Sequence, residues 1–293
     1  MMSEVSFIGL GVMGFPMAKH LQESGYSTTV YNRTESKAQD WVSKYGGSMA
    51  LTPATAAEGA EIVFICVGDD EDVRSVVYGE NGVLAGMNSG SVLVDHTTAS
   101  ATVAKEIAEV ASKQSVEFID APVSGGQAGA ENGQLTVMWD GGDTHVFANV
   151  EPVISSYAKA VNLIGPVGSG QTTKMVNQIC IAGLVQGLSE GLDFGRRAGL
   201  DMEKVLAAIS QGASGSWQMS NRSETMLKRE FDHGFALDWM RKDLNIVFDE
   251  AQRVGAELPV TAIVDEYYAE LQNQGHGRWD TSSLIELLRD DSL

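Results

Sequence analysis

Short apolar runs alternate with helical patterns from residue 4 to about residue 165. The runs expected to form strands are 5–8, 28–31, 62–67, 91–95, 116–120, 135–139 and 160–164. Helical periodicity fills several of the intervals, including 13–24, 34–44, 101–113 and 144–155. This alternation predicts an α/β domain with a doubly wound, mainly parallel sheet that carries helices on both faces. The near-continuous apolar run over 62–67 is typical of a strand buried on both faces.

The pattern changes at the glycine- and proline-containing segment 165–170. Helical periodicity then continues over about 170–198, 201–211, 220–229, 238–254, 259–274 and 281–289. We therefore expect a first domain over 1–165 and an all-α domain over 166–293, linked by the long helix at about 170–198. That helix is apolar around most of its circumference, which is typical of a helix buried between domains or subunits.

A glycine triplet follows the first expected strand, in the segment Gly9-Leu10-Gly11-Val12-Met13-Gly14. Gly9 allows a tight turn, Gly11 lets a pyrophosphate approach the backbone, and Gly14 lets the helix pack on the strand. The free N–H groups and dipole of the helix N-terminus attract the diphosphate. Because the triplet stands between a strand and a helix, it predicts a Rossmann-type dinucleotide-binding domain rather than a simple turn.

The end of the second expected strand indicates which dinucleotide is preferred. Asn32 stands where an NAD-binding domain carries an acidic residue for the ribose 2′-hydroxyl. Asparagine removes the repulsion toward a phosphate, and Arg33 could hold a 2′-phosphate. The alternative is that Arg33 is a solvated residue beside a helix cap at Thr34. We expect NADP as the preferred cofactor, with NAD possible.

A second glycine-rich segment, Asp120-Ala121-Pro122-Val123-Ser124-Gly125-Gly126, follows a buried strand. It should therefore lie at the carboxyl edge of the sheet, where open α/β folds bind ligands. The hydroxyl of Ser124 and the free N–H groups of Gly125 and Gly126 could hold a small carboxylate. A turn with no ligand is the alternative for this segment.

Lys174 lies early in the long helix among apolar residues, with Asn177 and Gln178 at i+3 and i+4. Either amide could orient the lysine or a substrate oxygen. Apolar surroundings lower the proton affinity of a lysine, which suits proton transfer near neutral pH. The alternative is a lysine that extends along the helix to solvent. Farther along, Lys242 and Asp243 are expected from the residues alone to be a solvated charge pair.

Composition excludes several classes of protein. The chain has 39 acidic and 20 basic residues and a formal net charge of −19, which argues against nucleic acid as a partner. Its two cysteines, Cys66 and Cys180, give neither a disulfide framework nor a metal-ligand spacing. No run of about 18 apolar residues and no basic leader is present. We expect a cytoplasmic protein with no metal, membrane or nucleic-acid partner.

Five segments in the same order resemble the β-hydroxyacid dehydrogenases, which include 3-hydroxyisobutyrate dehydrogenase, tartronate semialdehyde reductase and glyoxylate/succinic semialdehyde reductases. The matching segments are 7–14, 95–98, 120–142, 168–178 and 240–244, and the resemblance covers nearly the whole chain. It implies an NAD(P)-dependent enzyme that interconverts a small β-hydroxyacid and its semialdehyde. The implied substrates are of the 3-hydroxyisobutyrate, glycerate/tartronate semialdehyde, 4-hydroxybutyrate/succinic semialdehyde or glyoxylate class. A homodimer or homotetramer, packed partly through the long helix, is also implied.

The resemblance assigns roles to particular residues. Lys174 matches the catalytic lysine, which acts as general acid and base. Ser124 and Gly125, with Gly126 beside them, match the loop that holds the substrate carboxylate. The remaining matches concern the cofactor: Thr98 would lie on the nicotinamide side, Cys66 and Val67 on the adenosine side, and Lys242 would close over the cofactor from the helical domain.

Three positions depart from the family pattern. Gln178 takes a place where asparagine is frequent, so either Asn177 or Gln178 could contact substrate. Gly68 replaces a usual proline. His96 replaces a small or apolar residue, and we expect it to be packed or exposed rather than catalytic.

Several other activities remain open. An L-serine or other β-hydroxy-amino-acid dehydrogenase would use the same fold. An imine reductase would also share the fold, but Lys174 argues against it. A 6-phosphogluconate-type decarboxylase has a much longer helical domain and a basic phosphate site. A cofactor-sensing protein without chemistry should have lost the lysine or the Ser-Gly-Gly loop, and this chain retains both.

Overall fold

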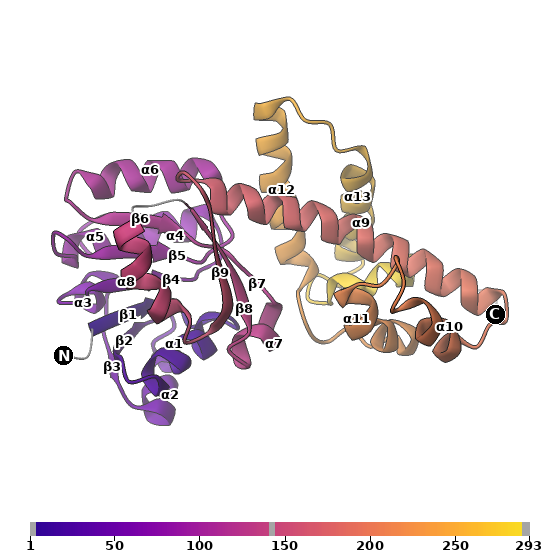
Figure 1. The fold of residues 1–293 in the computed structure, drawn as a ribbon, viewed down its shortest axis with the longest axis horizontal. Coiled ribbons are helices and arrows are strands. Elements are labelled where there is room, and N and C mark those ends of the chain that lie inside the picture. The colour runs from indigo at the N-terminus through magenta and orange to yellow at the C-terminus, as the bar shows by residue number, and fades with distance from the viewer. Residues whose placement is uncertain (1–3, 141–143, 289–293) are drawn as a thin grey trace. The chain divides into compact units, whose positions relative to one another are not determined.

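The computed structural model describes residues 4–140 and 144–288 (Figure 1). The chain divides into two compact units, Met1–Lys174 and Met175–Leu293, so the division falls inside one long helix. The sequence instead suggests a boundary at 165/166, where the last strand ends. Residues 141 and 142 of the matching segment 120–142 lie outside the described residues.

The first unit alternates strands and helices. Its strands are β1 (Glu4–Ile8), β2 (Ser27–Tyr31), β3 (Ser48–Met49), β4 (Ile62–Ile65), β5 (Val92–Asp95), β6 (Glu117–Asp120), β7 (Val123–Ser124), β8 (Leu135–Asp140) and β9 (Ala158–Gly165). Its helices are α1 (Gly14–Glu23), α2 (Glu35–Tyr45), α3 (Pro53–Ala57), α4 (Asp70–Val77), α5 (Val83–Gly86), α6 (Ala101–Ser112), α7 (Gly126–Glu131) and α8 (Thr144–Ile154). The start of α9 (Ser169–Arg197) completes the unit.

Six strands form a parallel sheet in the order β3-β2-β1-β4-β5-β6. Successive strand residues point to opposite faces, so Phe7 and Phe64 join one apolar cluster while Ile8 and Ile65 join another. The first cluster includes residues of α1 and α2, and the second includes residues of α4 and α6. The predicted doubly wound sheet with helices on both faces is confirmed (Figure 1). Strand order reverses between β1 and β4, which is where such folds bind ligands.

The expected strands 135–139 and 160–164 form a second sheet rather than extending the first. Its order is β7-β8-β9, with β7 antiparallel to β8 and β8 parallel to β9. Pro122 explains the change, because a proline has no N–H to donate to a ladder. Its carbonyl instead accepts the N–H of Met138 at 3.0 Å, which pairs the chain with β8 directly after β6 ends.

The second unit is helical, as predicted. It comprises the rest of α9 and then α10 (Met202–Ile209), α11 (Trp217–Lys228), α12 (Leu237–Val254), α13 (Pro259–Asn273) and the 3-10 helix η1 (Thr281–Leu288). Its main core joins Val185 of α9, Leu244 of α12 and Tyr268 of α13. Among the described residues, no helix combines the length and the apolar character needed to cross a bilayer.

Candidate active site

The three glycines of the first loop occupy three different environments. Gly9 has φ +98, and a Cβ atom added there would collide with the carbonyl oxygen of Cys66. A Cβ atom added at Gly14 would collide with the carbonyl oxygen of Gly9. At Gly11 nothing lies within 4 Å of an added Cβ atom. The loop is therefore tight at both ends and open in the middle, on the side where a diphosphate would approach.

Asn32 and Arg33, at the end of β2, make different contacts. The Asn32 Oδ1 atom accepts the N–H of Leu10 at 2.8 Å, and its Nδ2 atom donates to the carbonyl of Thr34 at 3.0 Å. Asn32 thus ties the glycine loop to the end of β2. Arg33 donates to Asp72 at 2.9 Å with 82% of its side chain exposed. Thr34 occupies the N-cap position of α2, but its side chain makes no capping hydrogen bond.

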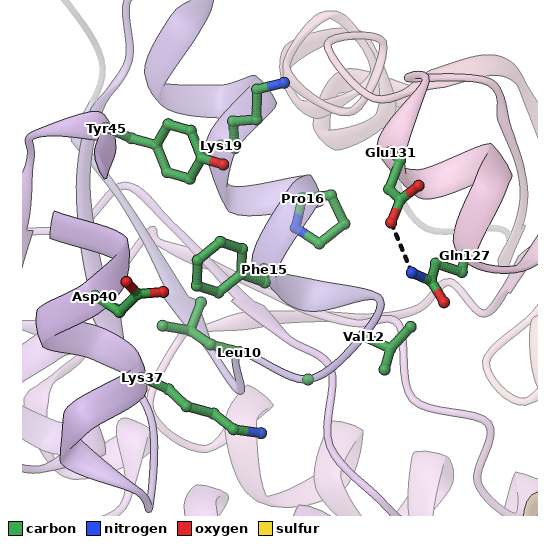
Figure 2. Close-up of a pocket in the computed structure, with 11 residues that line it drawn as sticks. Leu10, Val12, Phe15, Pro16, Lys19, Lys37, Asp40, Tyr45, Gln127 and Glu131 are labelled. Atoms are coloured by element: carbon green, nitrogen blue, oxygen red, sulfur yellow. Dashed lines mark hydrogen bonds between the residues drawn. The ribbon is translucent and has the colours of Figure 1, made fainter. Parts of the chain in front are cut away.

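A cavity of about 580 Å³ lies beside the glycine loop (Figure 2). Leu10, Gly11 and Val12 line one part of it, and α2 contributes Lys37. The full lining is Leu10, Gly11, Val12, Phe15, Pro16, Lys19, Lys37, Asp40, Tyr45, Gln127 and Glu131. Lys37 is not among the site residues predicted from the sequence. Its spacing of four residues from Arg33, at the start of a helix, is a signal that could have identified a second cation near the loop.

The loops after β4 and β5 are joined by a hydrogen bond. The N–H of Val67 donates to the Thr97 hydroxyl at 3.0 Å, and the N–H of Thr97 donates to Asp95 at 2.9 Å. Burial raises the pKa of Asp95 to about 7. The structure therefore brings Val67, next to Cys66, together with the loop that contains Thr98.

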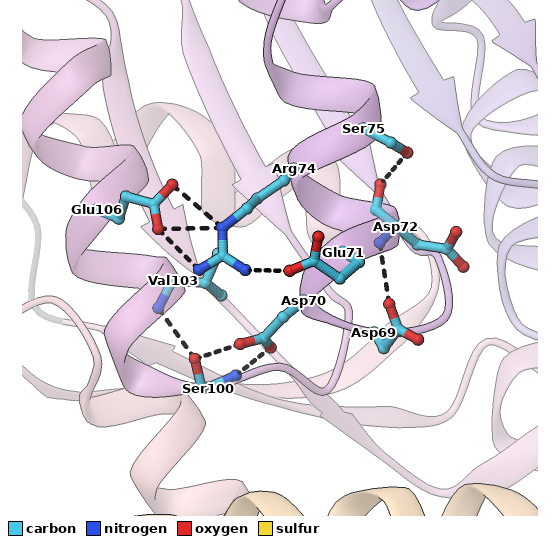
Figure 3. Close-up of polar contacts among 9 residues, drawn as sticks. All are labelled: Asp69, Asp70, Glu71, Asp72, Arg74, Ser75, Ser100, Val103 and Glu106. Carbon is cyan, nitrogen blue, oxygen red and sulfur yellow. Dashed lines mark hydrogen bonds and ion pairs between the residues drawn. The ribbon is translucent and has the colours of Figure 1, made fainter.

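The far end of the β5 loop is fixed by an acidic helix N-terminus (Figure 3). Asp70, the first residue of α4, accepts the backbone N–H of Ser100 at 2.8 Å and its hydroxyl at 2.6 Å. Ser100 in turn caps α6 by accepting the N–H of Val103 at 3.0 Å. Arg74 of α4 and Glu106 of α6 form an ion pair at 2.8 Å that joins the same two helices. Hydrogen bonds therefore hold the loop on both sides of Thr98, at Thr97 and at Ser100.

His96 is buried, and its two ring nitrogens are both engaged. Its Nδ1 atom lies 2.6 Å from the Ala121 carbonyl oxygen, and its Nε2 atom lies 2.8 Å from the Tyr157 hydroxyl. Because a carbonyl only accepts, Nδ1 carries the proton and Nε2 accepts from Tyr157. Burial lowers the pKa of His96 to about 4, so the ring is neutral. His96 is the packed histidine that the sequence allowed, and it holds the chain just before Pro122.

The segment 120–126 lies at the carboxyl end of β6, as expected. Ser124 belongs to the short strand β7 and is partly exposed, while Gly125 and Gly126 are exposed with φ values of +130 and +59. Asp120 is buried and accepts the N–H of Gly168 at 2.6 Å. The segment thus presents its Ser-Gly-Gly end to solvent and uses Asp120 to hold the start of α9.

A second carboxyl group is buried near Asp120. Asp140, at the end of β8, is fully buried, and its side-chain oxygens have no hydrogen-bond partner within the described part of the chain. Burial and the negative charge of Asp120 raise the pKa of Asp140 to about 9. Asp140 therefore keeps its proton to a higher pH than an ordinary aspartate does.

Lys174 is 8% exposed, which does not fit the alternative of a lysine extended into solvent. It follows the first turn of α9, which Asp120 holds through the N–H groups of Gly168 and Gln171. The Lys174 backbone is therefore fixed relative to the segment that contains Ser124. No cluster of three metal-ligating side chains occurs among residues 4–140 and 144–288.

The second unit contains the other predicted site residues. Asn177 donates to the Oε1 atom of Gln178 at 2.8 Å, and Gln178 donates to Asp243 at 2.6 Å. Lys242 forms an ion pair with Asp243 at 2.7 Å. The side chain of Asp243 is only 2% exposed and that of Lys242 is 19% exposed. The expected solvated charge pair is therefore largely buried, and it is connected to both amides.

Comparisons with known proteins agree with this architecture. A family model described as the NAD-binding domain of 6-phosphogluconate dehydrogenase matches residues 4–165. A second model, described as "NAD-binding of NADP-dependent 3-hydroxyisobutyrate dehydrogenase", matches residues 168–288.

Individual proteins are similar over nearly the whole chain. An oxidoreductase of Shewanella frigidimarina, itself described as uncharacterized, is 60% identical over 98% of each chain. The 2-hydroxy-3-oxopropionate reductase of Escherichia coli is 35% identical over 97% of each chain. The solved 3-hydroxyisobutyrate dehydrogenase of Mycobacterium tuberculosis, with L-serine, is 26% identical with a TM-score of 0.88, covering 99% of this chain and 100% of that one. The chain therefore belongs to the β-hydroxyacid dehydrogenase family of NAD(P)-dependent oxidoreductases.

Proposed function

We propose that the protein interconverts a small β-hydroxyacid and its semialdehyde, with NADP as the preferred cofactor and Lys174 as the general acid and base. The observation that carries this proposal is the burial of Lys174 one turn beyond residues that Asp120 holds in place. A lysine buried close to the carboxyl edge of an α/β sheet, where such folds bind ligands, is a candidate for a chemical role.

The residues of the first loop fit a dinucleotide. The open space at Gly11 leaves room for a diphosphate against the backbone, and Leu10, Val12 and Met13 complete the loop before Gly14. Asn32 is neutral, while Arg33 and Lys37 are cations near the loop, a combination that favours a 2′-phosphate. Cys66 and Val67 lie in the loop after β4, and Thr98 lies in the loop after β5. In this proposal all three contact the cofactor. When bound, the cofactor would supply the hydride as NADPH during reduction and accept it as NADP⁺ during oxidation.

The side chains have distinct tasks in this reaction. Ser124 and the exposed N–H groups of Gly125 and Gly126 bind the substrate carboxylate. Binding the carboxylate there orients the neighbouring carbon and its oxygen. Lys174 removes the hydroxyl proton during oxidation, and its ammonium group returns a proton to the carbonyl oxygen during reduction.

Asn177 is the better candidate of the two amides for contact with substrate. Both polar atoms of the Gln178 side chain are engaged, one with Asn177 and the other with Asp243. The side-chain oxygen of Asn177, Oδ1, takes part in neither of these two contacts. In this proposal Gln178 orients Asn177, and Lys242 contributes to cofactor binding from the ion pair with Asp243.

A homodimer or homotetramer is part of the proposal. Large apolar side chains along α9 are exposed in the single chain, including Phe194 at 73%, Val176 at 56% and Leu184 at 39%. Such exposure on a long helix is typical of a surface that another subunit covers. The expected cytoplasmic location stays a prediction.

A second candidate is dehydrogenation of L-serine or another β-hydroxy-amino acid. The solved Mycobacterium tuberculosis relative contains L-serine, which also carries a carboxylate and a β-hydroxyl group. The Ser124 loop and Lys174 would serve the same roles for that substrate.

Absorbance of NADPH distinguishes these substrates. We would assay reduction of a panel of semialdehydes, glyoxylate and cyclic imines, and oxidation of β-hydroxyacids, L-serine and 6-phosphogluconate. Turnover of semialdehydes or β-hydroxyacids well above the other compounds supports the proposal. Preferred turnover of L-serine supports the second candidate, and activity only on imines or 6-phosphogluconate contradicts both.

A further inference from the structure

The side chain of Gln171 connects α9 to the loop that contains Thr98. Its Nε2 atom donates to the Thr97 carbonyl at 2.7 Å, and its Oε1 atom accepts the N–H of Ala99 at 3.0 Å. One amide therefore contacts the backbone on both sides of Thr98. Gln171 is fully buried, so both hydrogen bonds lie away from competing water.

The backbone of Gln171 is held as firmly as its side chain. Its N–H donates to Asp120 at 2.8 Å. A Cβ atom added to the preceding residue, Gly170, would collide with the carbonyl oxygens of Asp120 and Met138. The first turn of α9 therefore lies directly against the backbone of β6 and β8 at Gly170.

Lys174 follows Gln171 by three residues, which is nearly one helical turn. The position of Gln171 therefore fixes the position of the Lys174 backbone relative to the 97–99 loop. We propose that Gln171 is a positioning residue that sets the distance between the Thr98 loop and Lys174. This inference rests on the proposed function, in which Thr98 contacts the nicotinamide side of the cofactor and Lys174 moves the proton.

The alternative is that Gln171 only fills space in the core. The two roles differ in their chemical requirements, because the positioning role needs a donor and an acceptor at the end of the same side chain. Gln171→Met preserves the approximate volume and removes both hydrogen bonds. Gln171→Glu keeps the shape, but an ionised carboxylate cannot donate to the Thr97 carbonyl. Once the introduced carboxyl group is protonated it can donate again, so both hydrogen bonds should re-form at low pH.

The kinetic test compares both variants with Gln114→Glu, a matched charge change at an exposed position after α6. We expect Gln171→Met to lower kcat by about 10²-fold, because small misplacements of reacting groups have effects of that size. We expect Gln171→Glu to regain activity relative to wild type as the pH falls, whereas Gln114→Glu follows wild type at every pH. Gln171→Met with kcat and KM within twofold of wild type would overturn the proposal.

A binding measurement makes the test independent of turnover. We expect Gln171→Met to weaken binding of NADPH while its affinity for adenosine 2′,5′-bisphosphate, which lacks the nicotinamide, stays at the wild-type value. Hydrogen exchange should show faster exchange at Ala99 and unchanged exchange at Val103, whose N–H is held by Ser100. Equal losses of affinity for both ligands, or unchanged exchange at Ala99, would contradict a positioning role. If wild type turns over none of the substrates, the proposed function fails, and these two measurements still decide whether Gln171 holds the loop.

Discussion

Asp120 accepts the backbone N–H of Gln171 at 2.8 Å, which joins the segment containing Ser124 to the helix containing Lys174. The same carboxylate accepts the N–H of Gly168 at 2.6 Å. A negative charge at a helix N-terminus is stabilising, because free N–H groups and the helix dipole both favour it. One buried aspartate therefore fixes the relative positions of the two groups proposed to hold and to protonate the substrate.

The first prediction concerns this aspartate. Asp120→Asn leaves a side chain with a single acceptor oxygen, so one of the two N–H groups loses its partner. We expect the variant to be less stable by about 1–3 kcal/mol, the cost of an unsatisfied buried group. Urea unfolding measures this change. Glu109→Gln, at an exposed position on α6, is the control and should change the stability by less than about 0.5 kcal/mol. If Asp120→Asn lowers the free energy of unfolding no more than Glu109→Gln does, Asp120 does not anchor the helix.

The second prediction concerns Asp140. Its pKa is raised to about 9 by burial and by Asp120, so between pH 3.8 and 9 the folded state binds a proton that the unfolded state lacks. The stability that this proton gives is therefore lost as the pH rises through that range, by about 1 kcal/mol per pH unit. Asp140→Asn is neutral at every pH. We expect the free energy of unfolding of Asp140→Asn to rise relative to that of wild type between pH 6 and pH 8, as measured by urea unfolding. A difference between the two proteins that stays the same over this range would contradict the prediction.

The third prediction concerns His96, whose titration has the opposite sign. Its folded pKa of about 4 lies below the usual 6.5, so the unfolded chain takes up a proton first as the pH falls. The stability from neutral His96 is present above pH 6.5 and is lost between pH 6.5 and pH 4. We expect the advantage of wild type over His96→Asn to shrink by about 2 kcal/mol from pH 7 to pH 5. An advantage that is equal at both pH values would show that His96 is not held neutral.

The fourth prediction concerns cofactor choice. Arg33→Ala should weaken the binding of NADPH by at least about tenfold and leave the binding of NADH nearly unchanged, because the guanidinium is proposed to contact the 2′-phosphate. Asp72→Asn removes the carboxylate that pairs with Arg33 and would compete with the 2′-phosphate for it. It should strengthen the binding of NADPH by no more than about fivefold, because exposed ion pairs are weak. Fluorescence titration with both cofactors measures these changes. Equal losses for NADPH and NADH in Arg33→Ala would contradict the NADP preference.

The sequence predicted most of the fold because its main elements have strong local signals. The strands β1, β4, β5 and β6 are mainly apolar runs, and the bounds of the expected helices agree closely with periodicity. The largest difference is at α11, which begins at Trp217 because the Ser216 side chain accepts the N–H of Met219. The strands β3 and β7 have two residues each, too short for any period to be visible. These two strands were missed for that reason, whereas β8 and β9 were expected as strands but not as part of a separate sheet.

The candidate site was only partly predictable from sequence. Glycine spacing and the segment 120–126 are local patterns, so they could be recognised directly. The contacts of Gln171 with Thr97 and Ala99, and that of His96 with Tyr157, join residues more than 60 positions apart in the chain. Their partners depend on the tertiary fold, and nothing in the neighbouring sequence marks them.

Single-turnover oxidation of NADPH by a saturating semialdehyde tests the central claim most directly. Lys174→Ala removes the proposed proton donor and the positive charge proposed to stabilise the developing alkoxide. Lys113→Ala, at an exposed position paired with Glu109, is the matched control. We predict that Lys174→Ala slows the single-turnover rate by about 10²- to 10⁴-fold while NADPH binds as in wild type, and that Lys113→Ala changes neither value. A Lys174→Ala rate close to that of wild type would contradict the account.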